Sequence, residues 1–295
     1  MTAMIDTPPA RPGAGKRLLA YPPVKILLAI VLVLVASKLV FALAEAIADK
    51  EARLLWPEVI AAIVVLLTYG AYVRHVEKRP AAELSRPGAL PEFGAGLLIG
   101  ASMVTVQVGI LYALGYYELA GVNAWTMKLI QPLAVMLFIG VVEEVIGRGI
   151  IFRITEESLG SRPAILLSAL LFGLAHLPGE GADIMAIGIT MVAGAFFAAA
   201  YMLTRRLWLC IGIHAAWNYT MGSIFSVAVS GRESKGLLVG TLTGPDWVTG
   251  GSYGLEASLP TLLVLVLVGG CFFWLARARG GFAAPKWRRA SGVVA

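Results

Sequence analysis

Long apolar runs, separated by short polar segments, dominate this 295-residue chain and constrain its fold more than any other feature. Hydrophobic residues make up 58% of the chain and charged residues only 14%, against about 25% charged residues in an ordinary globular protein. Runs of this length and polarity are typical of membrane-spanning helices. The sequence therefore predicts an all-α fold, a polytopic membrane helix bundle.

Eight runs are expected to form transmembrane helices. They cover residues 26–44, 59–73, 95–117, 127–152, 164–177, 184–203, 207–227 and 259–276. The first run is nearly twenty residues long. That length favours a spanning helix over a signal peptide, whose apolar core usually has about 7 to 15 residues.

Basic residues alternate between the polar segments that join these runs. Lys and Arg are frequent before the first run, between alternate later runs and after the last one, whereas segments 118–125 and 179–183 contain none. By the positive-inside rule, this pattern predicts that both termini are cytoplasmic. We expect a multi-pass integral protein, in a bacterial cell membrane. The net charge of +6 comes from short juxtamembrane clusters, so it does not indicate nucleic-acid binding.

Three ionisable side chains, Glu143, Glu144 and Arg148, lie inside the fourth apolar run. A charge at a helix centre costs about 2.5–3.5 kcal/mol on insertion scales, so such groups usually face the protein interior and carry function. Helical geometry places Arg148 one turn after Glu144, which predicts an ion pair, and turns Glu143 away by about 100°. Gly140 and Gly147 flank the carboxylates and would leave backbone open to a helix, a water or a peptide. Tight helix packing with a structural ion pair is the alternative interpretation.

Two of the three histidines, His176 and His214, also lie in apolar runs. Asn218 follows His214 by one helical turn, so an imidazole and an amide share one face. Phe172 precedes His176 by one turn, where its ring could line a site. A single buried histidine is more often a core residue, but two of them beside a diglutamate favour a functional site.

These side chains suit the hydrolysis of an amide bond. A carboxylate in a low-dielectric pocket can act as a general base for water, and imidazole and amide N–H groups can stabilise an oxyanion. The same set could bind zinc, with His176, His214 and Glu143 as the ligands. The chain has no HExxH motif, and each histidine stands alone on its helix. We therefore expect that glutamate-activated water suffices and that any divalent metal binds weakly.

Three motifs, EEVIGR, FGLAH and HAAWN, occur in that order on separate apolar runs. They match the EExxxR, FxxxH and HxxxN motifs of the CPBP family of intramembrane metalloproteases, so the chain resembles that family. The family includes the type II CAAX prenyl endopeptidases and the bacterial Abi proteins. The resemblance covers roughly residues 127–225. Gly147 departs from the pattern, because many members have an aromatic residue there, and this difference concerns the shape of the pocket.

The resemblance also implies roles for individual residues. Glu143 and His176 would activate the attacking water. His214 and Asn218 would hold the oxyanion. Glu144 and Arg148 would position these groups.

These observations predict that the chain is divided into four segments. They are a disordered cytoplasmic tail at 1–25, N-terminal transmembrane helices at 26–126, a CAAX-protease-like catalytic core at 127–225, and a C-terminal segment at 226–295. The last comprises an external glycine-rich loop, the final transmembrane helix and a basic cytoplasmic tail. Cys210 and Cys271 lie far apart in apolar runs, which predicts two core residues and neither a disulfide nor a cysteine metal site.

The leading hypothesis is an intramembrane endopeptidase that acts on a membrane-embedded or lipid-anchored peptide in contact with membrane lipid. A proton- or ion-coupled transporter is an alternative, because transporters also bury Glu and His relays. A non-catalytic membrane scaffold or immunity protein is a third possibility.

Overall fold

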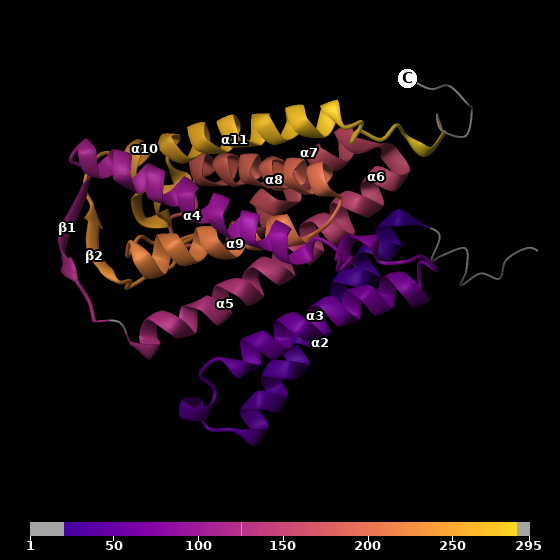
Figure 1. Cartoon of the computed structure of the whole chain (residues 1–295), viewed down its shortest axis with the longest axis horizontal. Coiled ribbons are helices and arrows are strands. Elements are labelled where there is room, and N and C mark those ends of the chain that lie inside the picture. The colour runs from indigo at the N-terminus through magenta and orange to yellow at the C-terminus, as the bar shows by residue number, and fades with distance from the viewer. Residues whose placement is uncertain (1–20, 125, 288–295) are drawn as a thin grey trace, which may run out of the picture.

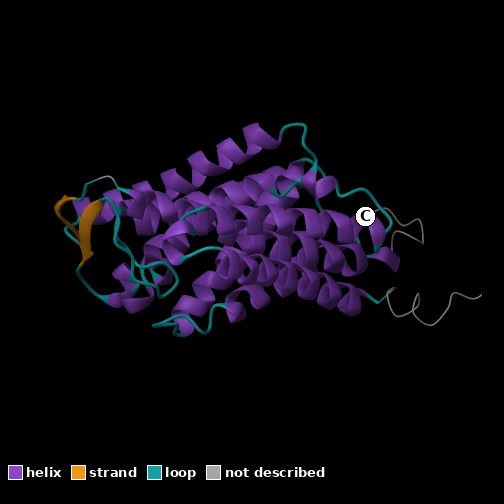
Figure 2. Ribbon diagram, turned by 90° about the horizontal axis from the view of Figure 1, so that it is seen from below, coloured by secondary structure: helices purple, strands orange, loops and turns teal. Residues whose placement is uncertain are grey.

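The protein forms a bundle of helices that run roughly along one direction (Figures 1 and 2). The computed structural model describes residues 21–124 and 126–287. A small sheet lies at one end of the bundle and α6 at the opposite end (Figure 1). The predictions made for residues 1–20 and 288–295, in the two cytoplasmic tails, lie outside the described residues.

The helices follow the predicted apolar runs. In chain order they are α2 Pro22–Ile47, α3 Trp56–His75, α4 Ala89–Ala113, α5 Met127–Glu144, α6 Arg153–Leu159, α7 Ser161–Ala175, α8 Ile184–Thr204, α9 Trp208–Tyr219, α10 Asp246–Thr249 and α11 Leu259–Ala278. Two π-helices continue α5 and α9, at Val145–Phe152 and Thr220–Ile224. Short 3-10 helices lie at Lys50–Ala52, Ala82–Leu84, Gly251–Tyr253 and Leu255–Ala257.

Six helical segments of the described chain are long and apolar enough to cross a membrane. They are Pro22–Ile47, Trp56–His75, Ala89–Ala113, Leu129–Leu159, Ile184–Thr204 and Leu259–Ala278. This confirms the predicted polytopic helical membrane protein. The predicted runs 164–177 and 207–227 are also helical, but α7 has 15 residues and α9 has 12 before its π-helical extension. Gly160, at φ 84°, and Pro178 limit α7 on its two sides. Six of the eight predicted runs thus meet this length criterion within the described residues, and the other two form the shorter apolar helices α7 and α9.

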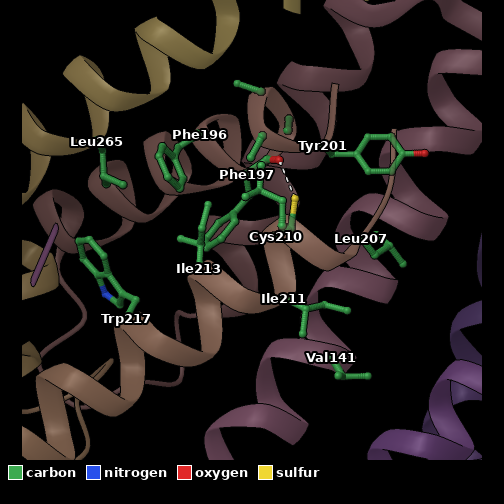
Figure 3. Close-up of a cluster of buried hydrophobic side chains, with 14 of the residues drawn as sticks. Val141, Phe196, Phe197, Tyr201, Leu207, Cys210, Ile211, Ile213, Trp217 and Leu265 are labelled. Carbon is green, nitrogen blue, oxygen red and sulfur yellow. Dashed lines mark hydrogen bonds between the residues drawn. The ribbon is translucent and has the colours of Figure 1, made fainter. Parts of the chain in front are cut away.

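Figure 3 shows the part of the hydrophobic core that surrounds α5 and α9. It brings together side chains from α5, α8, α9 and α11, among them Val141, Phe196, Phe197, Tyr201, Cys210, Ile211, Ile213, Trp217 and Leu265. The Cys210 thiol donates a hydrogen bond of 3.6 Å to the Phe197 carbonyl. Cys210 is buried as predicted, whereas Cys271 is exposed on the outer face of α11, which corrects its assignment to the core.

Small residues allow α4 and α9 to pack with their backbones in contact. A methyl group at Gly96 would lie 2.5 Å from the Leu209 carbonyl oxygen, and one at Gly100 would lie 2.4 Å from that of Ile213. Helix pairs in membranes commonly pack through small residues spaced four apart in this way. Because α9 carries His214, this contact sets the position of one predicted site residue.

Substitution of Gly100 by Ala is expected to destabilise the protein by about 1–3 kcal/mol, because the added methyl forces α4 and α9 apart. A matched control is Gly109→Ala on the same helix, where a methyl group meets no atom within 4 Å. The control should be neutral or stabilising by up to about 1 kcal/mol. Thermal unfolding of both purified variants measures the difference. Equal melting temperatures would show that the α4–α9 contact is looser than described.

A partly buried network of charges links the continuous α5–α6 helix to the end of α3. Arg153 donates to Glu77 at 2.6 Å and to Glu157 at 2.8 Å. Arg79 pairs with Glu77 at 2.8 Å and with Glu83 at 3.0 Å. Buried charges of this kind are stable only when they are paired, so the network fixes how the last turns of this helix lie against α3.

Two short strands close the opposite end of the bundle. β1 (Tyr117–Val122) pairs with β2 (Leu238–Leu242) in antiparallel fashion, with an irregularity between Leu119 and Gly121. Both strands lie in segments predicted to be loops. The third apolar run is predicted to be helical to residue 117, whereas α4 ends at Ala113. The sheet anchors the glycine-rich segment 230–258 to the link between α4 and α5.

Candidate functional site

A buried triad of charged groups organises the site: Glu144, Arg148 and His214. The predicted Glu144–Arg148 pair forms, with a distance of 3.1 Å between Arg148 Nη1 and Glu144 Oε1. The same carboxylate oxygen accepts a hydrogen bond of 2.8 Å from His214 Nδ1. Both Glu144 and Arg148 are fully buried. Since one carboxylate oxygen holds both partners, Glu144 sets the orientation of the His214 ring.

Two phenylalanine rings enclose the guanidinium of Arg148. Its central carbon lies 4.6 Å from the Phe172 ring centre and 4.8 Å from that of Phe197. Arg148 Nη2 also donates to the Gly194 carbonyl at 2.9 Å, which links the π-helix to α8. A cation between two aromatic faces is stabilised by their quadrupoles, most strongly where water is absent. These contacts explain how a full positive charge is held inside the bundle.

Glu143 lies beside this triad and faces both histidines. Its Oε2 atom is 3.8 Å from His176 Nε2 and 3.7 Å from His214 Nε2. The side chain is 32% exposed, yet Oε2 itself is buried and has no hydrogen-bond partner among the described residues. A buried carboxylate oxygen without a partner is costly, and it marks a place where a polar group is missing. The three side chains therefore surround a point suited to a water molecule.

His176 ends α7, and a backbone contact holds its ring. Its Nδ1 atom lies 2.8 Å from the Phe172 carbonyl oxygen. Because a carbonyl only accepts, Nδ1 carries the proton, and in the neutral ring Nε2 is left as an acceptor that faces Glu143. The ring of Phe172 also packs on the imidazole, with 4.8 Å between ring centres. Phe172 thus fixes the ring by its backbone and its side chain together.

Asn218 is buried one turn after His214 on α9, as the motif spacing predicts. It lines the same cavity as Glu143, His176 and His214. Within the described residues its amide takes part in none of the hydrogen bonds that order the site. An amide N–H group is therefore free to bind a ligand in the cavity.

The cavity has a volume of about 660 Å³. Phe172 and Gly147 line it, and a methyl group at Gly147 would meet no atom within 4 Å. Gly140 does not line it: a methyl group there would lie 3.2 Å from the Ala215 amide nitrogen. Gly140 therefore lets α5 approach α9, while Gly147 leaves open the space that an aromatic residue fills in many members of the resembled family.

A residue outside the three motifs, Glu256, shapes the rim of the cavity. It accepts hydrogen bonds from Trp217 Nε1 at 2.9 Å and from the Ser230 amide and hydroxyl at 2.6 and 2.8 Å. These bonds connect α9 and the segment that follows it to the segment before α11. Sequence reasoning missed Glu256, because no spacing links it to the motifs.

Phe197 is a second site residue that the sequence analysis missed. Its ring stacks on His214, with 5.0 Å between ring centres and an interplanar angle of 22°. It lies in the run AGAFFAAAY, where a core aromatic and a site aromatic look alike. Only the Phe-Phe pair amid small residues could have drawn attention to it.

The predicted zinc ligands, Glu143, His176 and His214, converge in the structure. Zinc bonds of about 2.0–2.2 Å in a tetrahedral site bring ligand atoms to about 3.3–3.5 Å from one another. The glutamate-to-histidine distances of 3.8 and 3.7 Å are wider. Across residues 21–124 and 126–287, no three His, Cys, Asp or Glu side chains are arranged to hold a metal ion. The two contacts of Glu143 are thus longer than the ligand-to-ligand distances of a tetrahedral zinc site.

Chelation is therefore expected to leave the activity of the purified protein unchanged. The measurement combines elemental analysis with cleavage assays before and after treatment with a chelator. Stoichiometric zinc, with activity lost on chelation and restored by zinc, would contradict this expectation and make Glu143, His176 and His214 the ligands.

Part of this chain is similar to a known protein family. A family model described as type II CAAX prenyl endopeptidase Rce1-like matches residues 124–220. A search of curated proteins finds no match. The matched segment contains the whole proposed site: Glu143, Glu144, Arg148, Phe172, His176, His214 and Asn218. It confirms the resemblance inferred from the motifs. Residues 124–220 of this multi-pass membrane protein are thus similar to the type II CAAX prenyl endopeptidase family.

Proposed function

We propose that the protein is an intramembrane endopeptidase that hydrolyses a peptide bond in a membrane-embedded or lipid-anchored protein, with water as the nucleophile. The observation that carries the proposal is the position of Glu143 Oε2, which is buried without a partner and faces the Nε2 atoms of His176 and His214. A water molecule between these groups would satisfy the carboxylate and be ready to react.

Glu143 and His176 would activate that water. The imidazole of His176 accepts one water hydrogen at Nε2, because its Nδ1 proton is engaged by the Phe172 carbonyl. The carboxylate of Glu143 accepts the other and removes it as the oxygen attacks the substrate carbonyl carbon. General-base catalysis by a positioned side chain contributes about 10²–10⁴-fold in rate.

His214 and Asn218 would stabilise the oxyanion that forms on the substrate carbonyl. The Glu144 carboxylate at Nδ1 stabilises positive charge on the His214 ring, which can then donate a second hydrogen bond from Nε2. The Asn218 amide supplies another donor one turn further along α9. Loss of one such donor typically costs about 10²–10³-fold in turnover.

In the final step of the reaction, Glu143 transfers its proton to the leaving nitrogen and the carbon–nitrogen bond breaks. The products are a new carboxylate and a new amine. Arg148 holds Glu144 in place and does not contact the substrate. The match to a protease family favours this chemistry over the transporter hypothesis, although Glu and His side chains in a membrane suit both.

The experiment that tests the proposal compares membranes from cells that express the wild type or Glu143→Gln. Newly formed protein N-termini are quantified by mass spectrometry. We expect a defined set of N-termini in or beside membrane segments that appears only with the wild type. Identical profiles at equal protein abundance, together with ion uptake by vesicles that needs Glu143, would replace the peptidase with a transporter.

A further inference from the structure

The two ends of the bundle differ in structure. We call the end that carries β1 and β2 the sheet end, and the opposite end, which carries α6, the α6 end (Figure 1). The links between α4 and α5, between α7 and α8, and between α9 and α11 lie at the sheet end. The links between α3 and α4 and between α8 and α9 lie at the α6 end. Successive spans therefore alternate in direction.

The two ends also differ in charge. Basic residues at the α6 end are Lys25, Arg74, Lys78, Arg79, Arg86, Arg153, Arg162, Arg205, Arg206, Arg277, Arg279 and Lys286. Those in the described links away from α6 are Arg232 and Lys235 near the sheet and Lys50 and Arg53 between α2 and α3. In short loops, Lys and Arg set the orientation of membrane proteins, and acidic residues contribute little. This asymmetry orients the α6 end toward the cytoplasm and the sheet end away from it.

The catalytic cavity reaches the sheet end. Its rim there includes Glu180 from the α7–α8 link and Arg232 and Glu233 from the segment after α9, and all three side chains are exposed. None of the described residues that line the cavity comes from the links at the α6 end. Charged, exposed side chains on the rim belong in water, so this opening leads to the aqueous phase beyond the sheet end.

A second part of the cavity wall is apolar and lies toward the lipid. It includes Met136 and Ile139 on α5 and Leu171 and Ala175 on α7. Leu171 is 38% exposed, and the neighbouring Leu170 is exposed on the same helix. A segment that is held in the bilayer could therefore enter between α5 and α7, with its polar end under the charged rim.

From these placements we propose that the cavity opens on the extracytoplasmic side of the membrane. This inference rests on the proposed peptidase function and names its substrate class. The substrates are membrane-anchored proteins whose scissile segment lies at the extracytoplasmic surface, next to the anchor. A lipidated C-terminus on the cytoplasmic leaflet faces the basic α6 end and cannot reach Glu143 by this route.

The first test determines the side of the membrane without any need for activity. Single cysteines replace Thr241 on β2 and Ala82 at the α6 end, both exposed and uncharged, in a chain whose exposed Cys271 is changed to Ser. Intact bacterial cells that express each variant are treated with a membrane-impermeant maleimide. We expect Thr241→Cys to be labelled at once and Ala82→Cys only after permeabilisation. The reverse pattern, or labelling of both in intact cells, would overturn the proposal.

The second test uses two single-span reporter proteins that carry the same library of juxtamembrane segments, placed on the extracytoplasmic or the cytoplasmic side. We expect cleavage of extracytoplasmic segments only, and loss of that cleavage in Glu143→Gln. Cleavage confined to the cytoplasmic reporter would overturn the inferred side while supporting the peptidase. Absence of cleavage in both would count against the peptidase, and the labelling result alone would then decide the side.

Discussion

Glutamine in place of Glu143 is expected to lower the turnover number on a verified substrate by about 10²–10⁴-fold, the usual contribution of a general base. The amide keeps the shape of the side chain but cannot accept the proton of the attacking water. Substrate affinity should change little, since the cavity walls remain. The rate constants are measured on purified protein with a peptide from the substrate identified in membranes.

The protein should still accumulate in the membrane at the wild-type level, because Glu143 Oε2 has no partner to lose within the described residues. Glu118→Gln is the matched control, since the same chemical change there affects an exposed side chain on β1. Cleavage by Glu143→Gln at the wild-type rate would show that another group removes the proton.

Replacement of Arg148 by Ala is expected to lower both the abundance and the activity of the protein. Arg148 is fully buried against Glu144, with two aromatic rings on its guanidinium. Removal of one partner of a buried ion pair costs about 3–5 kcal/mol, because the other charge is left unpaired. The amount of folded protein in detergent extracts and its melting temperature report this loss.

A double variant, Glu144→Gln with Arg148→Met, separates the structural role from the catalytic one. It removes both charges and keeps most of the side-chain volume, so abundance should recover relative to Arg148→Ala. Activity should stay low, because His214 then lacks the carboxylate that fixes its ring. Full activity in the double variant would mean that Glu144 and Arg148 only support the fold.

The charged and histidine residues of the site could be predicted because each is unusual in its surroundings. A charge in an apolar run has a cost, so Glu144 and Arg148 are visible by sequence alone, and helical spacing is enough to predict their contact. The motifs at His176 and His214 could be read in the same way. What spacing cannot show is which helices meet, and the convergence of three helices on Glu143 is a result of packing.

The parts that escaped prediction are those whose residues look ordinary. Phe197 stacks on His214 but lies in an apolar helix with other aromatics. Gly100 determines how closely α4 approaches α9, yet glycine is frequent in this chain. The sheet depends on pairing between residues more than a hundred positions apart, which local alternation in two short segments does not reveal. Long-range contacts between common residue types therefore cannot be predicted from a single sequence.

The π-helix Val145–Phe152 has a consequence for the evolution of this fold. Each of its turns takes in one residue more than an α-helical turn, so it changes the angular offset between the residues before it and those after it. Glu144 must face His214, and Arg153 must face Glu77, which follows the end of α3. Deletion of one residue between them is expected to convert π turns into α turns and to keep both contacts, whereas insertion of a further residue would rotate one contact by about 100° relative to the other. Relatives should therefore tolerate the loss of one residue in this segment better than the gain of one.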